Sequence, residues 1–471
     1  MWILQVACLA LAASAAVGSP QIFGILRAAD EVRGNGTDDD DAKYTLPKDF
    51  LLGAGTSAYQ VEGAWDADGK GVNVFDYYYH SKNYSVSRTG DVAADHYHRY
   101  KEDIALAKKI GLQIFRLSIS WARIFPNGTR DLGINKKGVD HYHDVIDELL
   151  KNNIVPFVTI FHFDYPQALE DKFGGWLSEN MTDAFEDYAD YLFEQYGDKV
   201  KLWLTINEAS MYCNLNGAMG MVPPGTITDN NKRMLCLHNL IIAHAKAHKI
   251  YKEKYLKKQQ GKVGFGVGPN FSRPNSTADE DVAAAEKANM VQGIGLSIEP
   301  LINGDYPEEA KTSGRPTFTD EGAWTLREIP KWVNKKWDIP VLFTENGLAS
   351  GSDVDDWDTR AVYSSAYLRE LAAGINEDGN KVIGYTLWSF IDTFEFGSYD
   401  MGWGLVSVDY KNGTLTRTPK NSWTFFKTVA LTRKVPLVEA GSDPFPEPSS
   451  AAAATSSLLL ATVAVLISRW L

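Results

Sequence analysis

Short apolar runs alternate with amphipathic segments along most of this chain. The apolar runs predict buried strands over residues 50–58, 113–120, 154–161, 201–205, 263–267, 341–344 and 382–388. Between them, apolar residues recur at spacings of three and four, which predicts helices over residues 97–110, 139–150, 185–196, 232–255 and 360–374. Apolar strands that alternate with amphipathic helices are typical of a parallel sheet buried on both faces.

The number and spacing of these strands favour a closed barrel over an open sheet. A chain of 471 residues with 44% hydrophobic residues suits one large α/β barrel or two ordinary domains. Polar residues gather where the predicted strands end, as with Gln60, His162 and the pair Asn207 and Glu208. The fold class that we predict is a (β/α)8 TIM barrel with its active site at that face.

Two of these strand ends carry glutamates within similar short segments. Thr205-Ile206-Asn207-Glu208 and Thr344-Glu345-Asn346-Gly347 each follow an apolar run. Two carboxylates at the mouth of one barrel are the minimum requirement for cleaving a glycosidic bond with retained stereochemistry.

Charge and cysteine content narrow the classes of partner. The formal net charge of −13 disfavours nucleic acid, whereas a neutral small molecule is compatible with it. Neither Cys213 nor Cys236 lies in a CxxC or Cys/His cluster, so we expect no metal site and no cofactor. These two cysteines either form one disulfide or remain two buried free thiols.

The N-terminal region has the pattern of a secreted protein. Residues 1–18 contain an apolar run followed by small residues, which predicts a secretory signal peptide. Residues 19–43 are polar and acidic, and we expect them to be disordered. Passage through the secretory route would also allow glycosylation at the N-x-S/T sequons at Asn35, Asn83, Asn127, Asn180, Asn270, Asn275 and Asn412.

The C-terminal region predicts a second targeting signal. Residues 436–457 have the composition of a linker, and residues 458–471 form an apolar tail. The apolar run is too short for an ordinary transmembrane helix, but with the small residues before it the tail resembles a GPI-attachment signal. A marginal tail anchor and an unanchored secreted form are the alternatives. Each places the protein outside the cell or on the outer face of the plasma membrane.

Several segments together resemble one enzyme family. They are residues 53–63, 115–123 and 162–166, the two glutamate segments, and residues 388–392 and 417–420. In this order they resemble glycoside hydrolase family 1, the β-glucosidase family, in its animal or insect form and similar to lactase-like proteins. The resemblance runs from Phe50 to Phe426, within a barrel that we assign to residues 44–435.

The resemblance implies a double-displacement mechanism on β-glucosides, with β-galactosides or β-fucosides as further substrates. It makes Glu345 the nucleophile and Glu208 the acid/base, with Arg116 stabilising the charge of the nucleophile. Retaining chemistry requires the two carboxyl groups about 5–5.5 Å apart. Plant S-glycosidases of this kind usually carry Gln where this chain has Glu208, so the resemblance indicates an O-glycosidase.

The family also suggests which residues hold the sugar. Gln60, His162, Asn207 and Glu395 would form hydrogen bonds with its hydroxyl groups, and Trp388 would stack under its ring. The chain departs from the family at two aromatic positions. Phe163 replaces a usual Trp, and Phe396 replaces the Trp that donates an indole N–H to the sugar.

A third departure concerns the barrel itself. After Tyr306 and Pro307 the family continues into a sixth strand, which carries a tyrosine that bonds to the nucleophile, and then into a long loop. Here residues 315–321 pass almost directly to the helix over residues 324–337, so the sixth strand and its loop are missing. Residues 315–319 could form a short substitute strand.

Three interpretations of this gap remain open. The sequence is a truncated splice form or gene-model error, an enzyme that is shortened but active, or a catalytically impaired carbohydrate-binding or receptor-like protein. A barrel that lacks an internal strand exposes two sheet edges with unpaired backbone groups.

Overall fold

The computed structural model describes residues 3–9, 42–81, 89–217, 222–268, 271–291, 294–308, 310 and 322–445. All seven predicted strands form, each within a few residues of its expected position. They are β2 (Leu51–Gly55), β3 (Ile114–Ser118), β4 (Val155–Phe161), β5 (Leu202–Ile206), β6 (Lys262–Val267), β7 (Val341–Gly347) and β8 (Val382–Trp388). With β1 (Ile3–Leu9) they form a closed parallel barrel in the order β1-β6-β5-β4-β3-β2-β8-β7, which confirms the predicted fold class.

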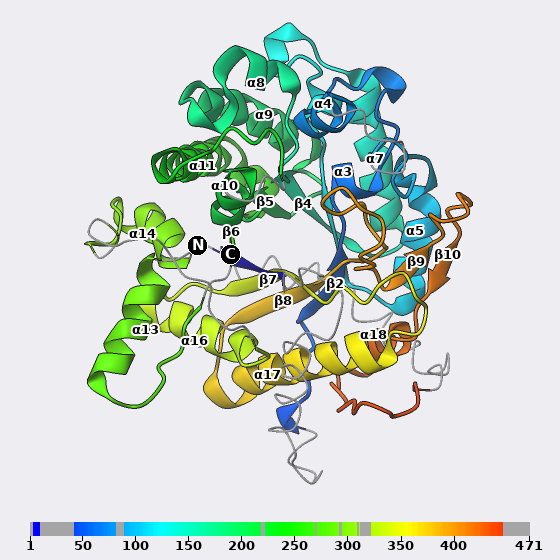
Figure 1. Ribbon diagram of the computed structural model, residues 1–471, viewed down its shortest axis with the longest axis vertical. Coiled ribbons are helices and arrows are strands. Elements are labelled where there is room, and N and C mark those ends of the chain that lie inside the picture. The colour runs from blue at the N-terminus through cyan, green and yellow to red at the C-terminus, as the bar shows by residue number, and fades with distance from the viewer. Residues whose placement is uncertain are drawn as a thin grey trace.

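Helices surround this barrel, as Figure 1 shows. The predicted helices correspond to α5 (His96–Ile110), α7 (Lys136–Lys151), α9 (Asn180–Tyr196), α11 (Asn230–Ile250), α16 (Thr325–Trp337) and α17 (Val362–Asp378). The others with more than six residues are α4 (Val74–Ser81), α8 (Gln167–Phe173), α10 (Ala209–Gly217), α13 (Asp279–Val291), α14 (Ile294–Asn303) and α18 (Trp423–Thr432). A two-stranded sheet of β9 (Val406–Val408) and β10 (Arg417–Pro419) follows β8 in the chain.

Among the described residues, nothing forms the sixth strand of the family at its expected place in the chain. Between β6 and β7 the described residues form α13, α14 and α16 but no strand, as the sequence predicted. The substitute strand suggested for residues 315–319 lies outside the described residues.

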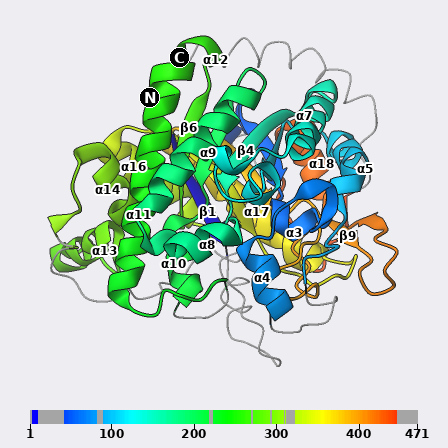
Figure 2. The same ribbon diagram turned by 90° about the horizontal axis from the view of Figure 1, so that it is seen from above.

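The vacant place in the barrel is taken by β1, which the sequence did not predict. Its residues pair in parallel with β6, with Ile3 opposite Gly264, and with β7, with Leu4 opposite Val341. Figure 2 shows β1 inside the ring of helices. Because both neighbouring edges would otherwise carry unpaired N–H and C=O groups, an apolar extended segment is well suited to this place. Cleavage of a leader after residue 18 would remove β1, so one molecule cannot combine leader removal with this closure.

Inside the barrel, an apolar layer lies below the strand ends. Its buried members come from five strands and are Leu51, Ile114, Phe157, Leu202, Leu204 and Leu342. Successive side chains of a strand alternate between its two faces, so Arg116 lies on the same face of β3 as Ile114, one layer further along. In the same way Thr159 follows Phe157 on β4. The lumen is therefore closed by hydrocarbon beneath a polar layer.

Two further features lie outside the strands. Cys213 and Cys236 form a disulfide that joins α10 to α11, so the first of the two alternatives for these cysteines is correct. The start of the expected linker is packed, because Val438 and Phe445 contact helical segments around the barrel. Val438 is buried, its N–H donates to Ser365, and the ring of Phe445 lies 5.0 Å from that of Trp357.

The pairing of β1 can be tested by one backbone substitution. In full-length protein produced without secretion, Val6→Pro removes the N–H of a residue that pairs with both β6 and β7. We expect it to lower the free energy of unfolding by at least about 1 kcal/mol relative to Val6→Ile, which keeps the N–H. Chemical denaturation measures the difference. Identical unfolding curves for the two variants would show that β1 does not close the barrel in solution.

Candidate active site

A single buried guanidinium connects the strand ends. Arg116 is fully buried, and its Nη1 donates to the carboxylate of Glu345 and to the backbone oxygen of Thr344 at 3.1 Å. Its Nη2 donates to Oδ1 of Asn207 at 2.7 Å, and its Nε donates to Oγ1 of Thr159 at 3.0 Å. One side chain of β3 thereby fixes groups on β4, at the end of β5 and on β7.

The two glutamates singled out from the sequence line one cavity. Glu208 and Glu345 are each 1% exposed. Glu208 stands between β5 and α10 with a φ of 37°, a left-handed conformation that non-glycine residues seldom adopt. Strained backbone of this kind is common at active sites, where the surrounding structure holds it.

All the predicted sugar-contacting residues line the same cavity. These are Gln60, His162, Asn207, Trp388, Glu395 and Phe396. Arg116, in contrast, does not line the cavity but lies behind Glu345. The structure thus brings together every residue that the sequence singled out for the site.

A hydrogen-bonded chain crosses one side of the cavity. Gln60 accepts a hydrogen bond from Ser57 and donates one to Glu395, which also accepts one from Thr393 at 3.2 Å. Because these bonds join the residues after β2 to the loop after β8, Gln60 and Glu395 are held as a pair. Near this pair, the rings of His162 and Trp388 stack with centroids 5.6 Å apart.

Burial and neighbouring charge set the protonation states. Burial raises the pKa of Glu345 above its usual value, and the adjacent Arg116 guanidinium opposes part of this rise. Burial and the charge of Arg116 hold the pKa of His162 well below its usual value, so its imidazole is neutral. Burial, together with the negative charge of Glu345, raises the pKa of Glu395 to about 8. At neutral pH the cavity therefore combines a guanidinium-paired carboxylate with a carboxyl group that is largely protonated.

Sequence reasoning missed several residues that line the cavity. They are Tyr59, Phe75, Tyr79, Met211, Leu215, Val222, Phe394 and Trp403. The helical spacing of Met211 and Leu215 after Glu208 could have indicated the first turns of a helix beside the acid. Trp403 lies too far from Glu395 in the chain for spacing to reveal it.

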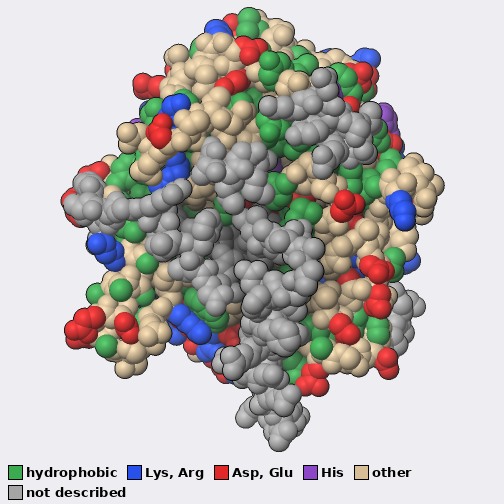
Figure 3. Space-filling view, viewed as in Figure 1, with side chains coloured by type: hydrophobic (Ala, Val, Ile, Leu, Met, Phe, Trp, Pro, Cys, Tyr) green, Lys and Arg blue, Asp and Glu red, His purple; other side chains and the backbone are tan. Residues whose placement is uncertain are grey.

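The described residues contain no group of three or more His, Cys, Asp or Glu side chains that could hold a metal ion. None of their helices is both long and apolar enough to cross a membrane. On the face shown in Figure 3, acidic and basic side chains are interspersed, with no single basic patch.

The raised pKa of Glu395 predicts a dependence of stability on pH. Between about pH 4.5 and 8, folded Glu395 keeps a proton that the unfolded chain has released. The free energy of unfolding contributed by this group is therefore lost as pH rises through that window. The Glu395→Gln variant cannot titrate at this position, so its free energy of unfolding should depend less on pH. From pH 5 to 8 the free energy of unfolding of wild type should therefore fall by on the order of 1–3 kcal/mol relative to that of the variant. A constant difference between their denaturation curves across this range would contradict the assignment.

Comparison with known proteins agrees with this architecture. The model of glycosyl hydrolase family 1 matches residues 42–323 and, separately, residues 317–435. The two matched stretches meet in the segment where the sixth strand was expected to be missing.

The matches to individual relatives span nearly the whole length of those proteins. Myrosinase 1 of Brevicoryne brassicae is 34% identical over 467 residues, covering 83% of this chain and 99% of the relative. A solved aphid myrosinase superposes with a TM-score of 0.77 at 32% identity, covering 83% of this chain and 100% of that one. A rice β-glucosidase, solved as a mutant in covalent complex with glucose, has a TM-score of 0.74 at 30% identity, covering 82% and 99%. On these matches, the chain belongs to glycosyl hydrolase family 1, a family of O-glycosyl hydrolases that contains the β-glucosidases.

Proposed function

We propose that this chain hydrolyses β-glucosides with retention of configuration, with Glu345 as nucleophile and Glu208 as acid/base. One observation carries the proposal: the two glutamates line the same cavity, and Arg116 is bonded to only one of them. An ion pair with a guanidinium favours the ionised form, which a nucleophile needs. Glu208 is the second carboxyl group in the cavity, and retaining chemistry needs such a group to donate a proton to the departing oxygen.

The reaction proceeds in two displacements. The carboxylate of Glu345 attacks the anomeric carbon while Glu208 protonates the departing oxygen, which leaves a glycosyl group bonded to Glu345. Glu208, now ionised, removes a proton from water as the water oxygen attacks the same carbon and releases the sugar. The covalent glucose complex of the rice relative supports an intermediate of this type.

The remaining cavity residues fit the binding of a neutral sugar. Gln60 and Glu395, held together, would bind adjacent hydroxyl groups, and the neutral imidazole of His162 can donate or accept a hydrogen bond. Asn207 is oriented by Arg116 and adds an amide at the same layer. Trp388 would stack against the apolar face of the ring.

The group that leaves is expected to depart through oxygen. Glu208 can protonate a departing oxygen, whereas a thiolate leaves without that assistance. Because one relative is named a myrosinase, a thioglucoside belongs beside an O-glucoside in every activity assay. Among the described residues, no feature of the cavity favours the alternative of a binding protein without turnover, and the pair of glutamates with Arg116 beside one of them supports hydrolysis.

We also propose that the chain passes through the secretory route. The disulfide between Cys213 and Cys236 supports this, because such bonds persist in oxidising compartments. The sequon asparagines among the described residues, Asn127, Asn180, Asn275 and Asn412, are all exposed. The proposed GPI signal lies outside the described residues, and release by a phospholipase would test it.

Two substitutions separate the roles of the glutamates. Glu345→Gln should abolish turnover of both aryl and alkyl β-glucosides. Glu208→Ala should lower kcat/KM about 10²–10⁴-fold on an alkyl β-glucoside and much less on a 2,4-dinitrophenyl β-glucoside, whose leaving group needs no proton. Azide should restore the second variant and yield a β-glucosyl azide, which NMR identifies.

Glu370→Gln provides the matched control, since Glu370 is a half-buried carboxylate on α17 that does not line the cavity. Its activity should equal that of wild type. Wild-type rates for Glu345→Gln, or an α-glucosyl azide from Glu208→Ala, would refute the mechanism.

A further inference from the structure

The loop between β8 and β9 brings four residues to the cavity: Phe394, Glu395, Phe396 and Trp403. In the family that the chain resembles, the residue after the glutamate is a Trp that donates an indole N–H to the sugar. Phe396 has no such donor. A sugar hydroxyl that met only this phenyl ring would lose a hydrogen bond that water had supplied.

Indole nitrogens without acceptors give the first clue to a replacement. Among the described residues, Nε1 is buried and has no hydrogen-bond partner in Trp176, Trp203 and Trp403. Of these three, Trp403 lines the cavity and the other two do not. A buried N–H without an acceptor is costly, and a ligand that supplies the acceptor removes this cost.

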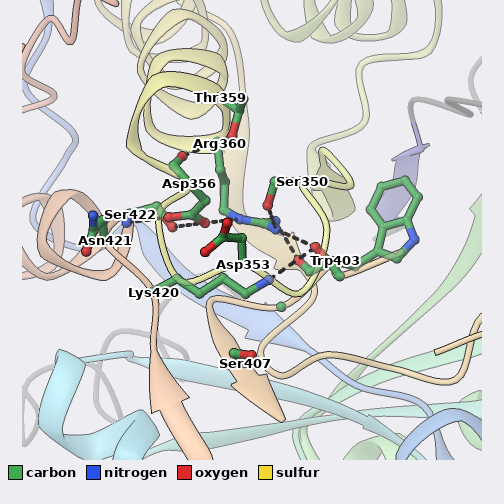
Figure 4. Close-up of polar contacts among 12 residues, drawn as sticks. Ser350, Asp353, Asp356, Thr359, Arg360, Trp403, Ser407, Lys420, Asn421 and Ser422 are labelled. Atoms are coloured by element: carbon green, nitrogen blue, oxygen red, sulfur yellow. Dashed lines mark hydrogen bonds and ion pairs between the residues drawn. The ribbon is translucent and has the colours of Figure 1, made fainter. Parts of the chain in front are cut away.

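The backbone of Trp403 is fixed by a buried polar cluster, shown in Figure 4. The guanidinium of Arg360, which is fully buried, donates to the backbone oxygen of Trp403 and, at 2.7 Å, to that of Gly402. Its Nε donates to Asp356 at 2.8 Å, which neutralises the buried charge. In Figure 4 the indole ring of Trp403 points away from this cluster.

A second buried cation secures the same turn. Lys420 donates to the backbone oxygens of Gly351 at 2.9 Å and Gly402 at 3.3 Å, and it pairs with Asp392 at 2.9 Å. Gly402 has a φ of 59°, and a Cβ there would lie 1.8 Å from the backbone oxygen of Gly351. The loops after β7 and β8 therefore meet backbone to backbone immediately before Trp403. This rigidity preorganises the indole, so that little ordering is needed when a ligand binds.

We propose that Trp403 determines specificity for the glycone: its indole N–H donates a hydrogen bond to one sugar hydroxyl, replacing the donor that Phe396 lacks. The inference rests on the proposed function of this cavity as a β-glucoside site. It assigns recognition of that hydroxyl to Trp403, which lies near the C-terminal end of the loop between β8 and β9.

The test compares Trp403→Phe with Trp203→Phe. Both changes remove a buried indole N–H without an acceptor, but Trp203 lies on β5 and does not line the cavity. The values of kcat/KM are measured on p-nitrophenyl β-glucoside and on its 2-, 3-, 4- and 6-deoxy analogues. We expect Trp403→Phe to lose about ten- to hundredfold on the glucoside. The loss should disappear on the one analogue that lacks the partner hydroxyl, and Trp203→Phe should match wild type throughout.

Other outcomes overturn the inference or separate it from the proposed function. Wild-type values of kcat/KM for Trp403→Phe would overturn it. An equal loss of kcat/KM on every deoxy analogue would also overturn it, because such a loss indicates a packing defect, which does not depend on one hydroxyl. If wild type hydrolyses no β-glucoside, the proposed function fails, and the affinity of deoxynojirimycin decides the inference. Weaker binding by Trp403→Phe alone supports it, and equal binding by both variants overturns it.

A measurement on wild type avoids any effect of the substitution on folding. In protein labelled with ¹⁵N-tryptophan, the indole resonance of Trp403 should shift downfield when deoxynojirimycin binds, while that of Trp203 stays in place. An unshifted Trp403 resonance in a saturated complex would overturn the inference.

Discussion

The cavity depends on one buried cation, the guanidinium of Arg116. It bonds to Thr159, Asn207 and Glu345 from the lumen of the barrel, so it joins β3 to β4, β5 and β7 across the interior. Removing one partner of a buried ion pair typically costs about 3–5 kcal/mol, because the other charge is left unpaired. The positions of Glu345 and Asn207 are therefore tied to β3 and β4, which lie away from the place of the missing strand. This explains how Glu345 and Asn207 keep their places at the cavity although no described residue between β6 and β7 forms a strand.

Closure of the barrel is a separate problem from assembly of the site. The edges of β6 and β7 need a neighbour, and in this structure residues 3–9 provide it. The same residues belong to the proposed signal peptide, whose removal would leave both edges open. Secretion with leader cleavage removes residues 3–9, whereas the closed barrel needs them paired with β6 and β7. Whether the mature protein keeps these residues decides between the two.

Much of the fold follows from the local pattern of apolar and polar residues. What this pattern could not predict are contacts between segments far apart in the chain. The apolar run that became β8 has the predicted bounds of Val382 and Trp388, because a strand buried on both faces has a clear sequence signature. The two glutamate segments could be placed because parallel strand ends share one face. The pairing of β1 with β6 and β7 depends on contacts between residues about 260 and 340 positions apart in the chain, which periodicity does not report. Trp403 was missed for a related reason, since its place in the cavity is fixed by Arg360 and Lys420 from other segments.

The central claim is that Glu345 forms a covalent bond with the sugar, and direct trapping tests it. Protein incubated with 2,4-dinitrophenyl 2-deoxy-2-fluoro-β-glucoside, digested and analysed by mass spectrometry should carry one fluoroglucosyl group on the peptide containing Glu345. A label on Glu208 instead, or hydrolysis of β-glucosides by protein that never becomes labelled, would contradict the account.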